Sequence, residues 1–127
     1  MNTKTYDLGL LFLRLSVGCL MLTHGIPKFQ TLLAGGEIQF PDPIGLGATF
    51  SLAMTVFAEA ICSFLIIIGL KTRLASIPLV ITMFVAAFIV HGNDAWAVKE
   101  KAVLYLCMYI VLLFTGAGNH SVDSKLK

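Results

Sequence analysis

Charged residues are scarce in this sequence. Only 13% of its 127 residues are Asp, Glu, Lys or Arg, whereas 57% are hydrophobic. A soluble globular domain carries about 25% charged residues, so the scarcity excludes an ordinary soluble domain. The net charge of +2 is spread along the chain and indicates no nucleic-acid partner. The composition therefore predicts one small domain embedded in the lipid bilayer.

Cysteine is also sparse, and its placement does not suit redox chemistry. The three cysteines, Cys19, Cys62 and Cys107, each lie inside an apolar stretch, and no Cys-x-x-Cys pair exists. A membrane thiol oxidase needs a reactive dithiol, so the pattern excludes that class and indicates small packing residues. A glycine-rich phosphate loop and a clustered metal-ligand motif are absent as well, and we predict no metal site.

Strict alternation of polar and apolar residues, which is typical of membrane β-barrel strands, is missing too. The sequence contains instead four apolar stretches near the length of about 20 residues that a spanning helix needs. These stretches cover residues 8–29, 46–70, 74–91 and 99–116. The sequence therefore predicts an all-α fold, an integral membrane four-helix bundle in which residues 1–127 form a single domain.

Basic residues divide unequally between the two sides of the predicted bundle. One side would carry five of them: Lys4, Lys71, Arg73, Lys125 and Lys127. The other side would carry three, Lys28, Lys99 and Lys101, together with the acids Glu37, Asp42, Asp94 and Glu100. The positive-inside rule then predicts a multi-pass protein of the cytoplasmic membrane with both termini in the cytoplasm.

Two residues of opposite charge interrupt the apolar stretches. Glu59 lies near the middle of the second stretch, and Arg14 lies inside the first. A charge at membrane depth is costly unless it is paired, protonated or hydrated, so such residues are usually functional. We predict that Arg14 reaches Glu59 and forms an intramembrane ion pair with it. The pair would be either a structural clamp or part of a functional site, and both roles stay open.

Helical spacing places further polar residues on inward faces of the bundle. In the first stretch one stripe, with His24 at its edge, contains Arg14, Gly18, Met21, Gly25 and Lys28. In the fourth stretch one face contains Lys101, Tyr105, Met108 and Leu112. Most of the ionisable residues in these stripes lie toward the outer end of the bundle, which makes that end the candidate site.

The candidate site residues fall into two groups. Glu59, His24 and His91 are candidate catalytic residues, for proton transfer or for a hydrogen bond to the carbonyl of a bound redox molecule. Lys28, Lys101 and Tyr105 are candidate ligand-binding residues. The alternative for each histidine is an interfacial hydrogen-bonding group without chemistry. Haem ligation through both histidines is geometrically feasible, but two histidines alone are a weak signal.

Two longer patterns point to a known family. The first is Arg14-Leu15, followed by His24-Gly25 and Lys28; the second is Ala58-Glu59, followed by Gly69 to Ala75 with the sequence Gly-Leu-Lys-Thr-Arg-Leu-Ala. With these patterns, with His91 and with the glycines of 116–123, the chain resembles the DoxX family of small four-helix membrane proteins. Cys62-Ser63 departs from the family, because many relatives have glycines after the glutamate.

The resemblance implies a quinone-interacting redox subunit, because some DoxX relatives are membrane subunits of thiosulfate:quinone oxidoreductase. In such a subunit His24 or His91 would hydrogen-bond a quinone carbonyl, and Glu59 would carry protons. Lys28 and Lys101 would attract an anionic donor. The sequence contains no evident redox centre, so electrons would come from another redox subunit or directly from the substrate.

Two other functions stay open. A non-catalytic accessory or assembly protein would keep Arg14 and Glu59 as an internal clamp and bind its partner through the outer loops. A small-molecule transporter ranks lowest, because small multidrug exporters carry their glutamate in the first span, where this chain has Arg14. Whether the protein is an enzyme stays open, although a bundle this small is compatible with a homo-oligomer.

Overall fold

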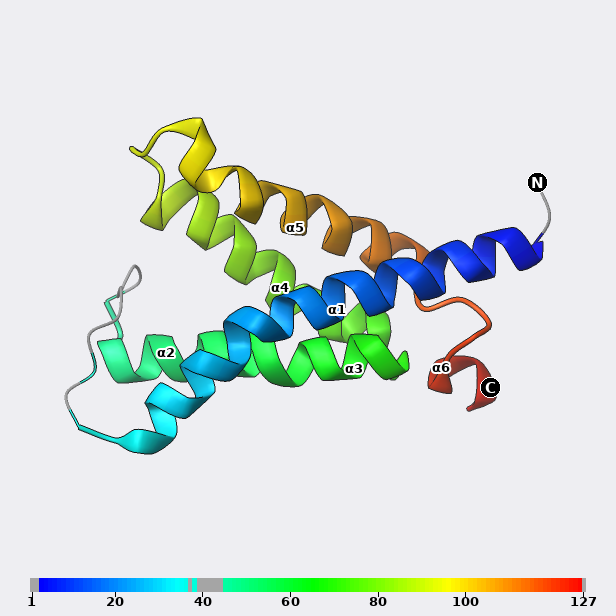
Figure 1. Cartoon of the computed structure of the whole chain (residues 1–127), viewed down its shortest axis with the longest axis horizontal. Coiled ribbons are helices and arrows are strands. Elements are labelled where there is room, and N and C mark those ends of the chain that lie inside the picture. Colours follow the sequence, from blue (N-terminus) through cyan, green and yellow to red (C-terminus); the bar gives the residue numbers. More distant parts are fainter. Residues whose placement is uncertain (1–2, 37, 39–44, 127) are drawn as a thin grey trace.

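The computed structural model describes residues 3–36, 38 and 45–126. Helices account for 82% of this part of the chain, and no strand occurs in it. The elements are α1 (Thr3–Ala34), α2 (Ala48–Val56), η1 (Phe57–Cys62), α3 (Ser63–Ile68), α4 (Thr72–Val85), η2 (Ala86–Val90), α5 (Trp96–Thr115) and α6 (Val122–Lys125). The two η elements are π-helical turns that continue their neighbours, so α2, η1 and α3 form one rod and α4 and η2 form another (Figure 1).

Four long rods run back and forth, and the predicted all-α membrane bundle is confirmed (Figure 1). The rods begin and end within a few residues of the predicted stretches, except that α1 extends about one turn beyond its stretch at each end. Both termini lie at the same end of the bundle, as four crossings require (Figure 1). The predicted acidic residues Glu37 and Asp42 lie outside the described residues.

Three of the rods are long and apolar enough to cross a membrane within the described ranges: Lys4–Ala34, Ala48–Ile68 and Thr72–Val90. The fourth rod, α5, has 20 residues and a total length of about 30 Å, of which the part after Lys101 is about 21 Å long. Its first turns carry Lys99, Glu100 and Lys101. These charges mark the boundary at which α5 enters the apolar layer, because they lie at one end of the helix.

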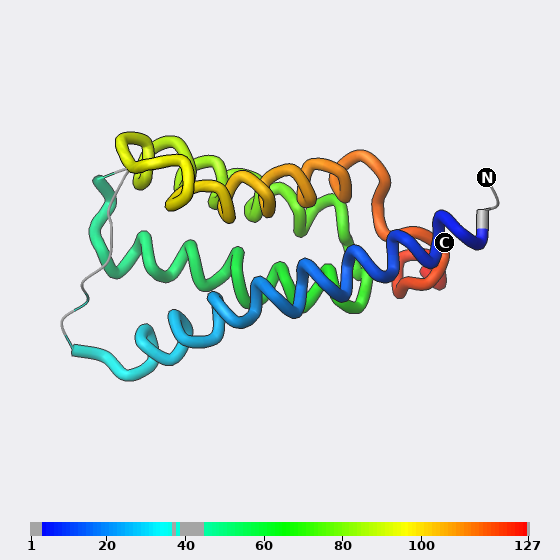
Figure 2. The backbone as a smooth tube through the Cα atoms, turned by 45° about the horizontal axis from the view of Figure 1, so that its top comes forward, coloured from blue at the N-terminus to red at the C-terminus, as the bar shows by residue number. Residues whose placement is uncertain are grey.

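The rods form two layers (Figure 2). One layer pairs α1 with the α2–η1–α3 rod, and the other pairs α4 with α5. Close approach within the first layer depends on two glycines of α1. A Cβ at Gly18 would collide with Ile67, and a Cβ at Gly25 would lie 2.7 Å from the carbonyl of Glu59. Small residues allow membrane helices this proximity, and here they fix the register of α1 against its neighbour.

The turn between α3 and α4 is tight because its residues adopt left-handed conformations. Gly69 has φ 74° and donates its N–H to Ile66 O, and Leu70 donates to Leu65 O. These two bonds end the rod in the manner of a glycine C-cap, as the sequence predicts. Lys71 follows at φ 50°, and α4 begins at the next residue.

Candidate functional site

Glu59 forms an ion pair with Lys28. Glu59 Oε1 lies 2.7 Å from Lys28 Nζ, and the side chains are 4% and 33% exposed respectively. Lys28 reaches this position because Gly25, about one turn earlier on α1, touches the main chain of Glu59. The ammonium group compensates a carboxylate that would otherwise be an isolated charge at membrane depth.

The predicted ion pair between Arg14 and Glu59 is wrong. Arg14 lies about three turns before Gly25, roughly 16 Å along α1 from the residue that contacts Glu59. Its side chain is buried, with 1% exposure. It donates four hydrogen bonds of 2.9–3.0 Å to the main-chain carbonyls of Ile66, Ile67, Ala117 and His120.

The partners of Arg14 explain why it is stable there. Ile66 and Ile67 belong to the last turn of α3, where carbonyls are left with few backbone donors and favour a nearby positive charge; Ile66 O accepts one bond from the Gly69 N–H and a second from Arg14. Ala117 and His120 lie in the segment after α5. The planar guanidinium group can bond several carbonyls at once, so Arg14 joins α1, α3 and the C-terminal segment. Arg14 therefore acts as a structural clamp, but it does so through main-chain carbonyls and not through the carboxylate of Glu59.

The C-terminal segment, residues 117–126, closes the same end of the bundle. The carboxylate of Asp123 accepts hydrogen bonds from the backbone N–H groups of Lys71 at 2.6 Å and Thr72 at 3.0 Å. It therefore caps the start of α4. Asn119 Nδ2 donates to Asp7 Oδ2 at 2.8 Å and ties the segment to α1. The end with the termini is consequently held by polar contacts from several helices.

A cavity of about 670 Å³ lies toward the other end, between the α2–η1 half of one rod and the α4–η2 rod. Its volume falls in the range of small-molecule sites. Most of its lining is apolar, and the hydroxyls of Thr55 and Thr82 donate back to carbonyls of their own helices. The charged and imidazole groups in its wall are Lys28, Glu59 and His91.

The cavity borders the outer surface of the bundle. Three of its lining residues, Met54, Phe57 and Ile81, are each about half exposed on the lipid-facing side, at 48%, 48% and 58%. In a membrane these side chains would contact hydrocarbon. The site thus combines an apolar side toward the bilayer with a charged inner wall.

Both π-helical turns lie beside this cavity. Phe57, Ala58 and Glu59 of η1 and Ala86 and Val90 of η2 line it. A π-helical turn widens the helix locally and is frequent at functional sites. Neither turn has a distinctive residue pattern, so the sequence predicts neither of them.

His91 ends η2 and lines the cavity. Its Nδ1 lies 2.8 Å from Asp94 Oδ2, and the Asp94 N–H donates to the His91 carbonyl at 3.0 Å. These two contacts close a short turn that fixes the imidazole ring. With Nδ1 engaged by the carboxylate, Nε2 is the ring nitrogen left for a ligand.

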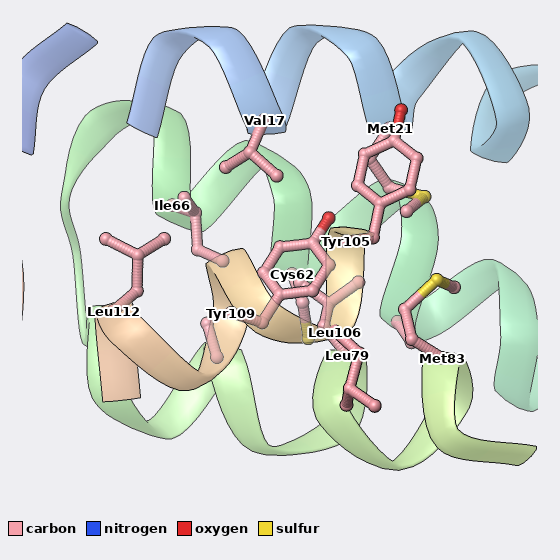
Figure 3. Close-up of a cluster of buried hydrophobic side chains, with 12 residues drawn as sticks. Val17, Met21, Cys62, Ile66, Leu79, Met83, Tyr105, Leu106, Tyr109 and Leu112 are labelled. Carbon is pink, nitrogen blue, oxygen red and sulfur yellow. The ribbon is translucent and has the colours of Figure 1, made fainter. Parts of the chain in front are cut away.

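The remaining predicted site residues form a second group outside the cavity lining. The rings of His24 and Tyr105 meet edge to face at 6.1 Å between centroids, and Tyr105 stacks on Tyr109. Both tyrosine rings point from α5 toward α1 within the buried cluster (Figure 3). Lys101 is exposed, so the predicted inward position of this residue is wrong. Tyr109 is fully buried and was missed, although it lies one turn after Tyr105.

The structure therefore separates the predicted residues by location. Lys28, Glu59 and His91 share the cavity. His24 and Tyr105 pair beside it, and Arg14 serves the opposite end. No three His, Cys, Asp or Glu side chains gather as a metal-binding group in the described ranges.

Comparison with known proteins gives one family. The DoxX family model matches residues 9–92 of the chain. An uncharacterized protein of Haemophilus influenzae is 32% identical over 126 residues, which cover 91% of this chain and 89% of its own. An uncharacterized membrane protein of Mycobacterium tuberculosis is 31% identical, with 90% of this chain and 78% of its own covered. A Bacillus subtilis protein named "Putative oxidoreductase CatD" is 33% identical, with 94% and 88% covered. No solved structure matches the chain.

Proposed function

Because this chain belongs to the DoxX family, we propose that it is a quinone-interacting component of a membrane oxidoreductase and that the cavity is its quinone site. One relative carries an oxidoreductase name, which supports the reaction class. The observation that carries the proposal is the Lys28–Glu59 pair in the wall of a largely apolar cavity at the outer surface of the bundle. We further propose that the protein lies in the cytoplasmic membrane with both termini in the cytoplasm.

The residues of the cavity suit a ring that carries oxygen atoms. The apolar wall formed by residues such as Phe57 and Val85 would contact the ring, while the Lys28 ammonium would donate a hydrogen bond to a carbonyl oxygen. Glu59 would accept a proton from a hydroxyl or return it to a carbonyl, depending on the direction of the reaction. The His91 ring, held by Asp94, would serve a second oxygen through Nε2.

A quinone supplies the redox chemistry, since it accepts two electrons and two protons from a donor. The described residues provide groups that hold or move protons, and a partner redox subunit would deliver the electrons. Cys19, Cys62 and Cys107 are free thiols, and none of them has a redox role in this proposal. Cys62 is a buried packing residue as predicted, whereas Cys19 and Cys107 are exposed, so the predicted packing role is wrong for these two. Any homo-oligomer would add a second copy of the same cavity.

The test is quinone retention by the purified protein. The chain is purified in mild detergent, its absorbance spectrum is checked for haem, and organic extraction then gives the quinone content per protein. We expect near-stoichiometric quinone in the wild type, none in Glu59→Gln and less in His91→Ala. His24→Ala is the matched control, because His24 is a histidine of the same end that does not line the cavity, and it should keep its quinone.

Two results would overturn the proposal. The first is a stable wild type that carries no quinone and takes up none when it is added. The second is equal loss of quinone in His24→Ala and His91→Ala, which would separate quinone binding from the cavity. Either result would favour the accessory or assembly function, in which the Arg14 clamp is the central feature of the bundle.

A further inference from the structure

We propose that the ligand of the cavity carries a long apolar chain, and that this chain lies in a second groove that runs from the cavity toward Lys71. The inference rests on the proposed function, because it takes the cavity as the site of the quinone ring. It narrows the ligand to lipid-soluble quinones with an extended hydrocarbon tail, and it assigns the tail a binding surface of its own.

The groove lies along the same pair of rods as the cavity. It has a volume of about 360 Å³ and lies between the α2–η1–α3 rod, with Cys62 and Leu65, and α4, with Leu74, Ala75 and Ile77. Phe57 and Pro78 line both the cavity and the groove. The two spaces therefore share part of their wall, and the proposal places the head of the ligand on one side of Phe57 and Pro78 and its tail on the other.

The distribution of polar groups gives the direction of the ligand. Lys28, Glu59 and His91 belong to the cavity, whereas the only charged residue that lines the groove in the described part of the chain is Lys71 at its far end. Pro78 and Lys71 are about 10 Å apart along the helix. A molecule with an oxygen-bearing head and an apolar tail matches this order, head in the cavity and tail toward Lys71.

A membrane phospholipid would occupy the same groove in the opposite direction. Its phosphate would lie at the membrane boundary, where Lys71 could pair with it, and its acyl chain would run inward toward Phe57. The wall that the groove shares with the cavity favours the quinone tail, because the oxygen-binding groups lie on the cavity side and Lys71 is the only charged residue among the described residues that line the groove. The two occupants can be separated by experiment, since only the phospholipid depends on Lys71.

The experiment compares quinones with one head group and different tails. The full chain is placed in lipid nanodiscs, and binding is measured for a quinone without a tail, one with a decyl tail and one with a long isoprenoid tail. Ile77→Trp fills the groove, and Ile61→Trp is its control. Both isoleucines face the lipid, at 43% and 50% exposure, and Ile61 lines neither space.

We expect Ile77→Trp to weaken the two tailed quinones by about fivefold and to leave the tailless one unchanged. The effect is modest because bilayer hydrocarbon solvates the tail almost as well as the groove does, so only packing contacts are lost. Each affinity is compared with that of the wild type for the same quinone, which cancels partitioning into the bilayer. Ile61→Trp and Lys71→Gln should alter none of the three.

The outcomes separate this inference from the proposed function. If the wild type binds no quinone, with or without a tail, the proposed function fails and the inference fails with it. If the wild type binds the quinones but Ile77→Trp affects tailed and tailless forms alike, only the inference is overturned. If Lys71→Gln releases a bound phospholipid and thereby strengthens quinone binding, the groove is a lipid site and the inference is likewise overturned.

Discussion

Replacement of Arg14 by Met tests whether this residue is the carbonyl clamp of the bundle. The substitution keeps a long side chain and removes all four hydrogen bonds. Ile66 O keeps a bond from the Gly69 N–H, so the carbonyls of Ile67, Ala117 and His120 lose the donor that Arg14 supplied. A polar group left without a partner costs about 1–3 kcal/mol, and water reaches the less buried of the three, so we expect a loss of about 4 kcal/mol.

Double-mutant cycles then measure whether Arg14 is energetically coupled to Glu59. Arg14→Met combined with Glu59→Gln should be additive to within about 0.5 kcal/mol, because the two residues share no partner and lie far apart. Lys28→Met combined with Glu59→Gln is the matched positive control. Those two side chains touch, and we expect a coupling of about 1 kcal/mol, reduced from that of a fully buried pair because Lys28 is partly exposed.

The assay is reversible unfolding of the purified protein in mixed micelles of mild detergent and dodecyl sulfate, followed by circular dichroism. The free energies of unfolding of the wild type, the single variants and the double variants close each cycle. A coupling above about 1 kcal/mol between Arg14 and Glu59 would refute the separation of the two residues. Unchanged stability in Arg14→Met would refute the clamp itself.

Three further predictions concern packing, capping and orientation. Gly25→Ala should cost about 2 kcal/mol and weaken the Lys28–Glu59 contact, because its Cβ would strike the Glu59 main chain. In the same unfolding assay Gly9→Ala, whose Cβ meets nothing within 4 Å, should not destabilise and should gain up to about 1 kcal/mol from helix propensity. Asp123→Ala should cost about 1 kcal/mol by uncapping α4 and should speed proteolysis of residues 117–126, whereas Asp123→Asn should lose part of the cap, because its amide keeps one acceptor oxygen for two backbone N–H groups. Green fluorescent protein fused to either terminus should fluoresce, and alkaline phosphatase inserted after Gly36 should be active; the reverse pattern would place the termini outside.

Much of the fold follows from the sequence because the bilayer restricts the choices. Apolar stretches of about 20 residues must become helices, so four of them give an even number of crossings. The inward stripe of α1 is also predictable, since Arg14, Met21 and Gly25 repeat at helical spacing and are all buried. The glycine at position 69 ends the second rod for a reason visible in its residue type.

The partners of the charged residues were harder to predict. Composition shows that Arg14 and Glu59 each need compensation, but backbone carbonyls carry no residue signature, and so the end of α3 and the segment after α5 could not be identified as acceptors. The pairing of Lys28 with Glu59 depends on the register that Gly18 and Gly25 impose on α1. Gly25 faces Glu59 and Gly18 faces Ile67. With the two helices in this register, Arg14 lies too far along α1 to contact Glu59.

The two π-helical turns beside the cavity were harder still to predict from the sequence. Residues 57–62 and 86–90 contain ordinary helix-compatible residues, and their π-helical geometry depends on how the rods pack. The cavity exists between these turns, so its size could not be anticipated from the residues that line it. The polar residues of the cavity lining could be anticipated, because Lys28, Glu59 and His91 are the rare charged or imidazole groups of their stretches.

The hydrogen bonds of Arg14 join distant parts of the chain, and this affects when the bundle can be completed during synthesis. Two of its four carbonyl acceptors, Ala117 and His120, lie 103 and 106 residues further along the chain. A ribosome that synthesises this protein delivers the first helix to the bilayer long before those acceptors exist. The hydrogen bonds of Arg14 are therefore completed last, and the bundle reaches its final state only when the C-terminal segment has emerged and folded back onto the first helix.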